Sequence, residues 1–133
     1  MIFVDSNVLI DLIESNSQWG DWSENQLALG RVTEGLVINA IVYAEISRTF
    51  ATQRRLDDFL SDVEVKCVSI PNAAAFAAST AHRTYRSSGG ARTTTLPDFF
   101  IGAHAQVENF SLLTRGAARI RSYFPQVTLI APE

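Results

Sequence analysis

The sequence has 133 residues, 47% hydrophobic and 19% charged, which suits one compact core and excludes a disordered chain. A net charge of -3 argues against broad nucleic-acid binding through a basic surface, and the single cysteine excludes an internal disulfide. No apolar run approaches the ~20 residues of a membrane span, and the acidic N-terminal segment is unlike a signal peptide. We therefore expect a cytoplasmic protein, not bound to a membrane, with residues 1–133 as a single domain.

The first half of the chain alternates short apolar runs with helical patterns. It predicts a strand, two helices, a second strand and two more helices, over residues 2–4, 8–13, 17–33, 36–38, 40–52 and 56–63. Gly35 ends the second helix, and Asn39 is a good N-cap for the third.

The second half continues the alternation. It predicts a strand, an alanine-rich helix, a helix opened by Pro97, a strand, a short helical turn and a last strand, over residues 65–70, 72–85, 97–108, 111–114, 117–124 and 127–130. Short apolar strands separated by helices indicate a parallel sheet with helices on both faces. The predicted fold is therefore a three-layer α/β/α sandwich around a central parallel sheet of four to five strands.

Three acidic residues lie where this topology can bring them to one edge of the sheet. Asp5 ends the first strand, Glu45 lies about two turns into the third helix, and Asp98 lies in the first turn of the helix opened by Pro97. Ligands bind outside the carboxyl ends of parallel strands, and gathered carboxylates repel each other unless a cation neutralises them. Mg²⁺ and Mn²⁺ prefer such oxygen ligands and can activate water, which predicts phosphodiester cleavage.

Each acid also has a purely structural explanation, so spacing alone leaves the question open. Asp5 can cap the following helix, Glu45 can pair with Arg48, and Asp98 is favoured by the helix dipole without any catalysis.

Other residues have weaker signals. Arg92 and Arg115 flank the expected acidic pocket and are candidates for contacts with an RNA phosphate, with solvated surface arginine as the alternative. Cys67 stands between valines and is predicted to be a buried core residue. We expect His104 to serve packing or a backbone hydrogen bond.

Four segments of the chain form a pattern: VDSNVLIDLIE at 4–14, INAIVYAEISR at 38–48, LPDFFIGAHA at 96–105 and LLTRGAARIRSYFPQVTLIAPE at the end. These segments resemble the motifs of PIN domains, and most of all those of VapC toxins from bacterial toxin–antitoxin pairs. The resemblance spans nearly the whole chain in the right order. It implies a PIN-like sheet of strand order 3-2-1-4-5, an RNA substrate, a homodimer and an antitoxin partner that blocks the pocket.

The resemblance also assigns residues. It implies Mg²⁺ or Mn²⁺ held by Asp5, Glu45 and Asp98, which match the three acids of the family. Asn7 and Thr114 fall near this pocket and are expected to hydrogen-bond a carboxylate or the metal's waters.

The fourth motif departs from the family pattern, which usually has an acid directly after the Thr-Arg pair. Here Gly116 follows Thr114 and Arg115. The loss of a carboxylate should lower metal affinity and makes a second metal less plausible. The leading hypothesis is a VapC-like, metal-dependent endoribonuclease. The alternative is a catalytically weak or inactive PIN-fold binding module.

A phosphatase or other metal-dependent hydrolase of similar build is a further alternative. It needs a DxD-type opening, and the sequence Asp5-Ser6-Asn7 lacks the second aspartate.

Overall fold

The computed structural model describes residues 1–89 and 96–132, and its centre is a five-stranded parallel sheet. The strands are β1 (Ile2–Val4), β2 (Leu36–Ile38), β3 (Val65–Cys67), β4 (Ser111–Leu113) and β5 (Leu129–Ile130). Their order across the sheet is β3-β2-β1-β4-β5, and every neighbouring pair is parallel. The predicted α/β class and the strand order are confirmed.

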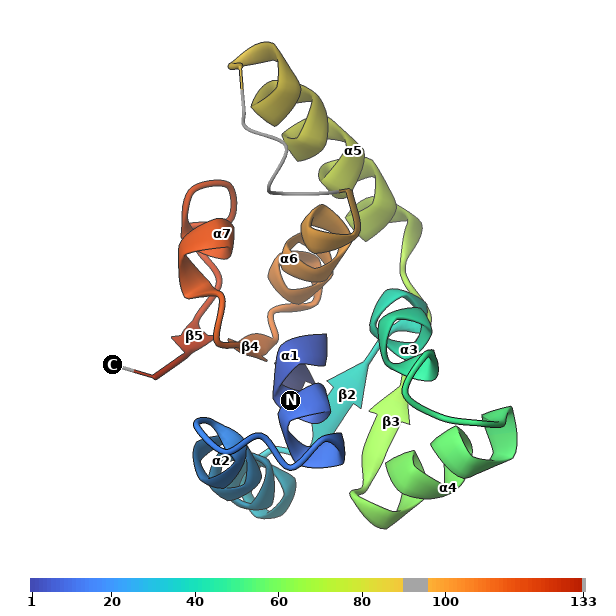
Figure 1. The fold of residues 1–133 in the computed structure, drawn as a ribbon. Coiled ribbons are helices and arrows are strands. Elements are labelled where there is room, and N and C mark those ends of the chain that lie inside the picture. Colours follow the sequence, from blue (N-terminus) through green and yellow to red (C-terminus); the bar gives the residue numbers. More distant parts are fainter. Residues whose placement is uncertain (90–95, 133) are drawn as a thin grey trace.

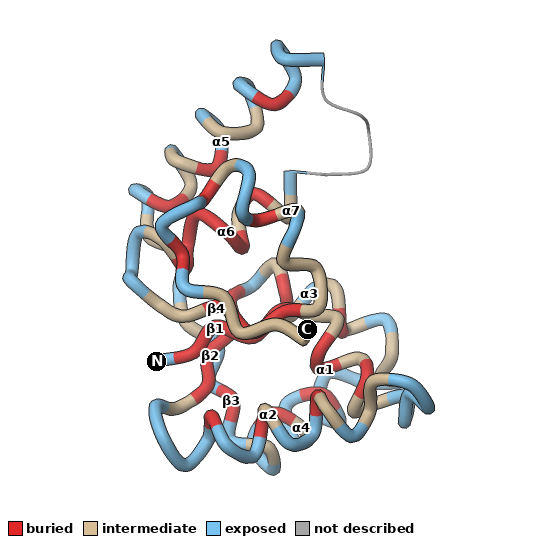
Figure 2. Tube along the Cα trace, turned by 90° about the vertical axis from the view of Figure 1, so that its left-hand side faces the viewer, coloured by how far each residue is buried: buried red, intermediate tan, exposed pale blue. Residues whose placement is uncertain are grey.

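Helices cover both faces of this sheet. They are α1 (Ser6–Ile13), α2 (Gly20–Thr33), α3 (Ala40–Ser47), α4 (Gln53–Asp62), α5 (Asn72–Ser87), α6 (Leu96–Glu108) and α7 (Ala117–Arg121). Figure 2 shows α1, α2 and α4 on one side of the sheet and α5, α6 and α7 on the other, which makes three layers. Helices α5 and α6 lie side by side in Figure 1. Within residues 1–89 and 96–132, no helix is both long and apolar enough to cross a membrane.

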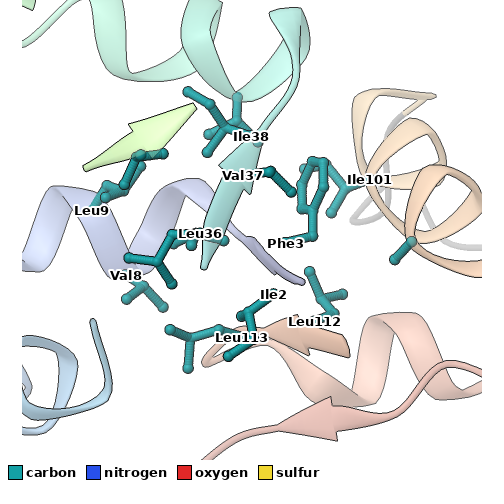
Figure 3. Packing of buried hydrophobic residues seen from close by; sticks show 14 of the residues in the cluster. Ile2, Phe3, Val8, Leu9, Leu36, Val37, Ile38, Ile101, Leu112 and Leu113 are labelled. Carbon is teal, nitrogen blue, oxygen red and sulfur yellow. The ribbon is translucent and has the colours of Figure 1, made fainter. Parts of the chain in front are cut away.

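The core forms around β1, the central strand, whose three residues are all buried. Phe3 pairs in register with Val37 of β2 and Leu112 of β4, so their side chains lie on the same face of the sheet. Figure 3 shows Phe3 and Val37 beside Ile101 of α6. Strands that are covered on both faces in this way consist of apolar residues without polar alternation.

Several sequence-based boundaries are wrong, including those of α2, α7 and β5, and the end of β3 also overturns the expected burial of Cys67. The helix expected to reach residue 52 ends at Ser47, and α4 starts afresh with Thr52 as its N-cap, whose hydroxyl accepts a hydrogen bond from the backbone N–H of Arg55 at 3.2 Å. Strand β3 ends at Cys67, which is exposed. Because β3 is an edge strand, only its first residue, Val65, is buried.

Candidate functional site

A polar pocket of about 370 Å³ lies at the carboxyl edge of the sheet. Side chains from α1, α3, α6, α7 and the loop after β4 line it: Ser6, Asn7, Ile10, Glu45, Arg48, Asp98, Arg115, Gly116 and Arg119. Asp5 directly follows β1 and is only 2% exposed, so it lies buried beside the pocket. The structure thus brings the three predicted acids, which belong to separate elements, to one place.

Asp5 is held by hydrogen bonds on both carboxylate oxygens. Its Oδ1 accepts the backbone N–H of Ser6 at 2.8 Å, so Asp5 is also the N-cap of α1. Its Oδ2 accepts hydrogen bonds from the Thr114 hydroxyl at 2.7 Å, the Asn7 amide at 3.3 Å and the Arg119 guanidinium at 3.1 Å. Asp5 therefore does cap the following helix, as its purely structural explanation predicted, but the cap uses only Oδ1.

Asn7 and Thr114 orient this carboxylate, as predicted for residues close to the pocket. The Thr114 hydroxyl accepts the backbone N–H of Gly116 at 2.9 Å, which directs its own proton toward Asp5. Asn7 donates its amide to Asp5 and accepts the backbone N–H of Arg115 at 3.2 Å. The loop after β4 and the start of α1 are thus tied together around Asp5.

Asp98 lies in the first turn of α6 and shares a cation with Asp5. One guanidinium nitrogen of Arg119 contacts Asp98 Oδ1 in a short ion pair, and the other contacts Asp5 Oδ2. The side chains of Asp5 and Asp98 are 3% and 12% exposed, whereas that of Arg119 is 33% exposed. A single arginine therefore bridges two of the three predicted acids.

Glu45 is the acid that keeps an unused oxygen. Its Oε1 is buried and has no hydrogen-bond partner in the described parts of the chain. Burial raises the pKa of Glu45, and the charges of Asp5 and Asp98 raise it further, although Ser6 and Arg119 oppose the shift. An unpartnered buried carboxylate oxygen is unfavourable, so Oε1 of Glu45 is an atom with an unmet need for a hydrogen-bond donor or a cation.

The donor set suits a divalent cation, although Arg119 now occupies part of it. Among the described residues, no three acidic, histidine or cysteine side chains stand close enough to hold a metal. The guanidinium of Arg119 lies between Asp5 and Asp98 and contacts a carboxylate oxygen of each. Two carboxylates that already share one cation, next to a third with a free oxygen, have the chemistry that Mg²⁺ or Mn²⁺ requires.

Arg115, predicted as a contact for an RNA phosphate, is engaged elsewhere. Its Nε and Nη2 donate to the two oxygens of Asp11 at 2.7 and 2.9 Å, and its guanidinium lies 5.5 Å from the ring centre of Trp19. Asp11 is 1% exposed and also accepts a hydrogen bond from Ser23 at 2.7 Å. A phosphate would have to compete with Asp11 for the guanidinium of Arg115, which is held by two hydrogen bonds. Arg92, the other candidate, lies outside the described residues.

Sequence reasoning missed the role of Arg119. A Cβ at Gly116 would stand 2.6 Å from both Nε and Nη2 of Arg119, so the guanidinium lies in the space that a side chain there would need. The sequence did contain a signal for it. Gly116 stands where the family pattern has an acid, and Arg119 follows three residues later, about one helical turn away.

The protein is an α/β protein with an open parallel sheet and helices on both faces. Its candidate site is a group of carboxylates at the carboxyl edge of the sheet. The family model described as "PIN domain" matches residues 2–123, and the chain belongs to this family. No curated protein sequence matches the chain.

Solved structures support the same fold. VapBC2 from Rickettsia felis, bound to a promoter DNA fragment, has a TM-score of 0.75 and 22% identity, with 98% of each chain covered. DNA-bound VapBC from Salmonella typhimurium has a TM-score of 0.72 and 15% identity, covering 98% of this chain and 96% of that one. A toxin–antitoxin complex from Klebsiella pneumoniae has a TM-score of 0.69 and 22% identity, covering 100% and 98%. At these identities the likeness concerns the fold.

Proposed function

We propose that the chain is a VapC-like toxin, a metal-dependent endoribonuclease that hydrolyses RNA phosphodiester bonds and is inhibited by a cognate antitoxin. The observation that carries this proposal is the convergence of Glu45 and Asp98 on one open pocket, with Asp5 buried beside it and Glu45 Oε1 without a hydrogen-bond partner among the described residues. Membership of the PIN domain family supports a nuclease. Residues 1–133 would act as one domain, and the single cysteine suits the cytoplasm.

The three acids would hold Mg²⁺ or Mn²⁺. The bound ion would supply positive charge for the scissile phosphate and lower the pKa of a water molecule. Thr114 and Asn7 orient the Asp5 carboxylate by their hydrogen bonds, so its position is set before any substrate binds. Glu45 would contribute a carboxylate whose Oε1 has no hydrogen-bond partner among the described residues, so a cation that binds it displaces no donor there.

The partners follow from the same comparisons. The similar structures from Rickettsia felis and Salmonella typhimurium are VapBC complexes, and the one from Klebsiella pneumoniae is a toxin–antitoxin complex. We therefore propose a VapB-like antitoxin for this chain, and from the resemblance to VapC toxins we also propose a homodimer. Because Asp11 holds Arg115, exposed Arg48 at the pocket is a better candidate to contact an RNA phosphate.

Cleavage of structured RNA in the presence of Mn²⁺ tests the proposal. The native chain should cut the RNA, and Asp5→Asn should lower the rate by about two orders of magnitude or more, because it removes a charge from the carboxylate site. Asp21→Asn is the matched control, since Asp21 is exposed on α2, and it should leave the rate unchanged. Equal cutting by all three proteins would rule out this site.

Expression in a bacterial host tests the toxin. Growth should stop when the native chain is produced, and Asp98→Ala should relieve the arrest while Asp21→Ala does not. A non-catalytic binding module is the second candidate, favoured by the glycine at 116 and by the Arg119 bridge. Absence of both RNA cleavage and Mn²⁺ binding in the native chain would support it.

A further inference from the structure

We propose that Arg119 is a built-in competitor of the divalent cation, and that the metal must displace its guanidinium before the carboxylates can bind it. The inference rests on the proposed function of the pocket and concerns how that site is regulated. Its basis is the bridge that the two terminal nitrogens of Arg119 make between Asp5 Oδ2 and Asp98 Oδ1. A metal ion and this guanidinium would compete for the same two oxygens, because both are cations and like charges repel at such short range.

The bridge depends on the loop after β4. Gly116 is the N-cap residue of α7 and has no side chain, and the guanidinium of Arg119 fills the space beside it. A Cβ at this position would stand 2.6 Å from Nε and Nη2, closer than van der Waals contact permits. The glycine at 116, which stands where the family pattern has an acid, thus also leaves room for the guanidinium of Arg119.

When no metal is bound, the charges favour the bridge of Arg119 between Asp5 and Asp98. Asp5 and Asp98 would repel each other without a cation, and the guanidinium neutralises one of their two negative charges while meeting their geometry with two separate nitrogens. Glu45 takes no part in the bridge and keeps its buried Oε1 without a partner. The bridge therefore stabilises two of the acids and leaves the third available.

The bridge can also open. The Arg119 side chain is 33% exposed and belongs to a short helix at the rim of the pocket, so the guanidinium has a direct route into water. Only the fraction of molecules with the bridge open can bind the metal, and the apparent affinity falls in proportion to that fraction. Removal of the guanidinium should therefore increase metal affinity.

Direct binding of Mn²⁺ to the full chain, measured by calorimetry and by the loss of free-ion EPR signal, tests this inference. Arg119→Met keeps a long side chain without charge and should bind Mn²⁺ about tenfold more tightly or better, because the competing state disappears. The Mn²⁺ affinity of Arg119→Lys should lie between those of the native chain and Arg119→Met. A single ammonium group cannot contact both carboxylates with two separate nitrogens as a guanidinium does. Arg121→Met removes the same charge from an exposed position of α7 and should match the native chain.

The outcomes separate this inference from the proposed function. If the native chain and Arg119→Met bind Mn²⁺ equally, or if the variant binds more weakly, Arg119 does not compete with the metal. That result would overturn this inference without contradicting the proposed nuclease site. If no protein binds Mn²⁺ and none cuts RNA, the proposed function fails and the inference fails with it. If Arg119→Met does not fold, as judged by circular dichroism, the Lys variant decides: affinity no higher than native overturns the inference.

Discussion

The hydroxyl of Thr114 donates a 2.7 Å hydrogen bond to Oδ2 of Asp5, joining residues 109 positions apart in the sequence. Thr114 follows β4 and Asp5 follows β1, and these strands are neighbours in the sheet. Both residues are buried, and their contact is continuous with the strand pairing because the Asp5 N–H donates to Leu113 O at 2.9 Å. The sheet itself therefore sets the position of the central carboxylate.

Thr114→Val tests how much this hydroxyl matters, because the two side chains have nearly the same shape. The variant leaves Asp5 with one donor fewer, so we expect a loss of about 1–3 kcal/mol in the free energy of unfolding. RNA cleavage should fall by about tenfold to a hundredfold, as when a residue that orients a metal ligand is removed. Thr114→Ser keeps the hydroxyl and should restore most of the activity. Urea unfolding and a cleavage assay measure the two effects, and full activity in Thr114→Val would contradict the assigned role.

The pair formed by Asp11 and Arg115 should be a main support of the fold around the pocket. Arg115→Ala leaves the buried Asp11 carboxylate without its cation, and we expect the free energy of unfolding to fall by about 3 kcal/mol, toward the lower end for a broken buried pair because Arg115 is partly exposed. The control is Arg31→Ala, which breaks an exposed 3.3 Å pair with Glu64 and should cost less than about 1 kcal/mol. Equal losses in the two variants would show that burial of Asp11 does not make its pair stronger.

His104 should make stability depend on pH. It is buried, burial lowers its pKa below the ordinary 6.5, and its Nδ1 lies 3.0 Å from the side-chain amide nitrogen of Asn39. The Asn39 oxygen already accepts the backbone N–H groups of Ile41 and Val42, so the amide offers its NH₂ to His104, which must accept and therefore be neutral at Nδ1. The ring also packs against Phe3 and Phe110, as the packing alternative expected, whereas its hydrogen bond is with a side chain and not with the backbone.

The sign follows from the lowered pKa of His104. The unfolded chain takes up the proton first, so stability is complete above pH 6.5 and falls as the pH drops through 6.5 toward the folded pKa. Urea unfolding at about pH 7.5 and about pH 5.5 should show this loss in the native chain. The loss should be smaller in His104→Leu, which cannot take up the proton. An unchanged pH dependence in that variant would assign the effect to other groups.

Gly116→Ala tests the space occupied by Arg119 without changing any charge. The added methyl group would meet the guanidinium, which is the mobile end of a flexible side chain and can move away. We expect Mn²⁺ to bind more tightly than to the native chain, by a smaller factor than in Arg119→Met, because the arginine remains. The same calorimetric titration measures it. Weaker binding than native would show that the bridge survives the crowding and that the alanine disturbs the carboxylates instead.

The sequence alone determined the class of fold, for reasons that are local, and offered Asp5, Glu45 and Asp98 as candidate site acids. Strands such as Ile2–Val4 are continuous apolar runs, and Asn39 and Asp5 are recognisable N-caps, so element type and order follow from short-range chemistry. The resemblance to PIN domains added the strand order, which local patterns do not contain. Boundaries such as the end of β3 at Cys67 depended on the strand's place at the sheet edge.

Only the tertiary structure decided which charges meet. Arg115 and Arg119 are four residues apart and look equivalent in the sequence, yet one pairs with buried Asp11 and the other bridges Asp5 and Asp98. Both pairings depend on where β4 lies in the sheet, and that of Arg119 depends also on the space beside Gly116. Ion pairs act over a few ångströms, so the partner of a charge is set by the packing of distant segments, which a linear pattern does not encode.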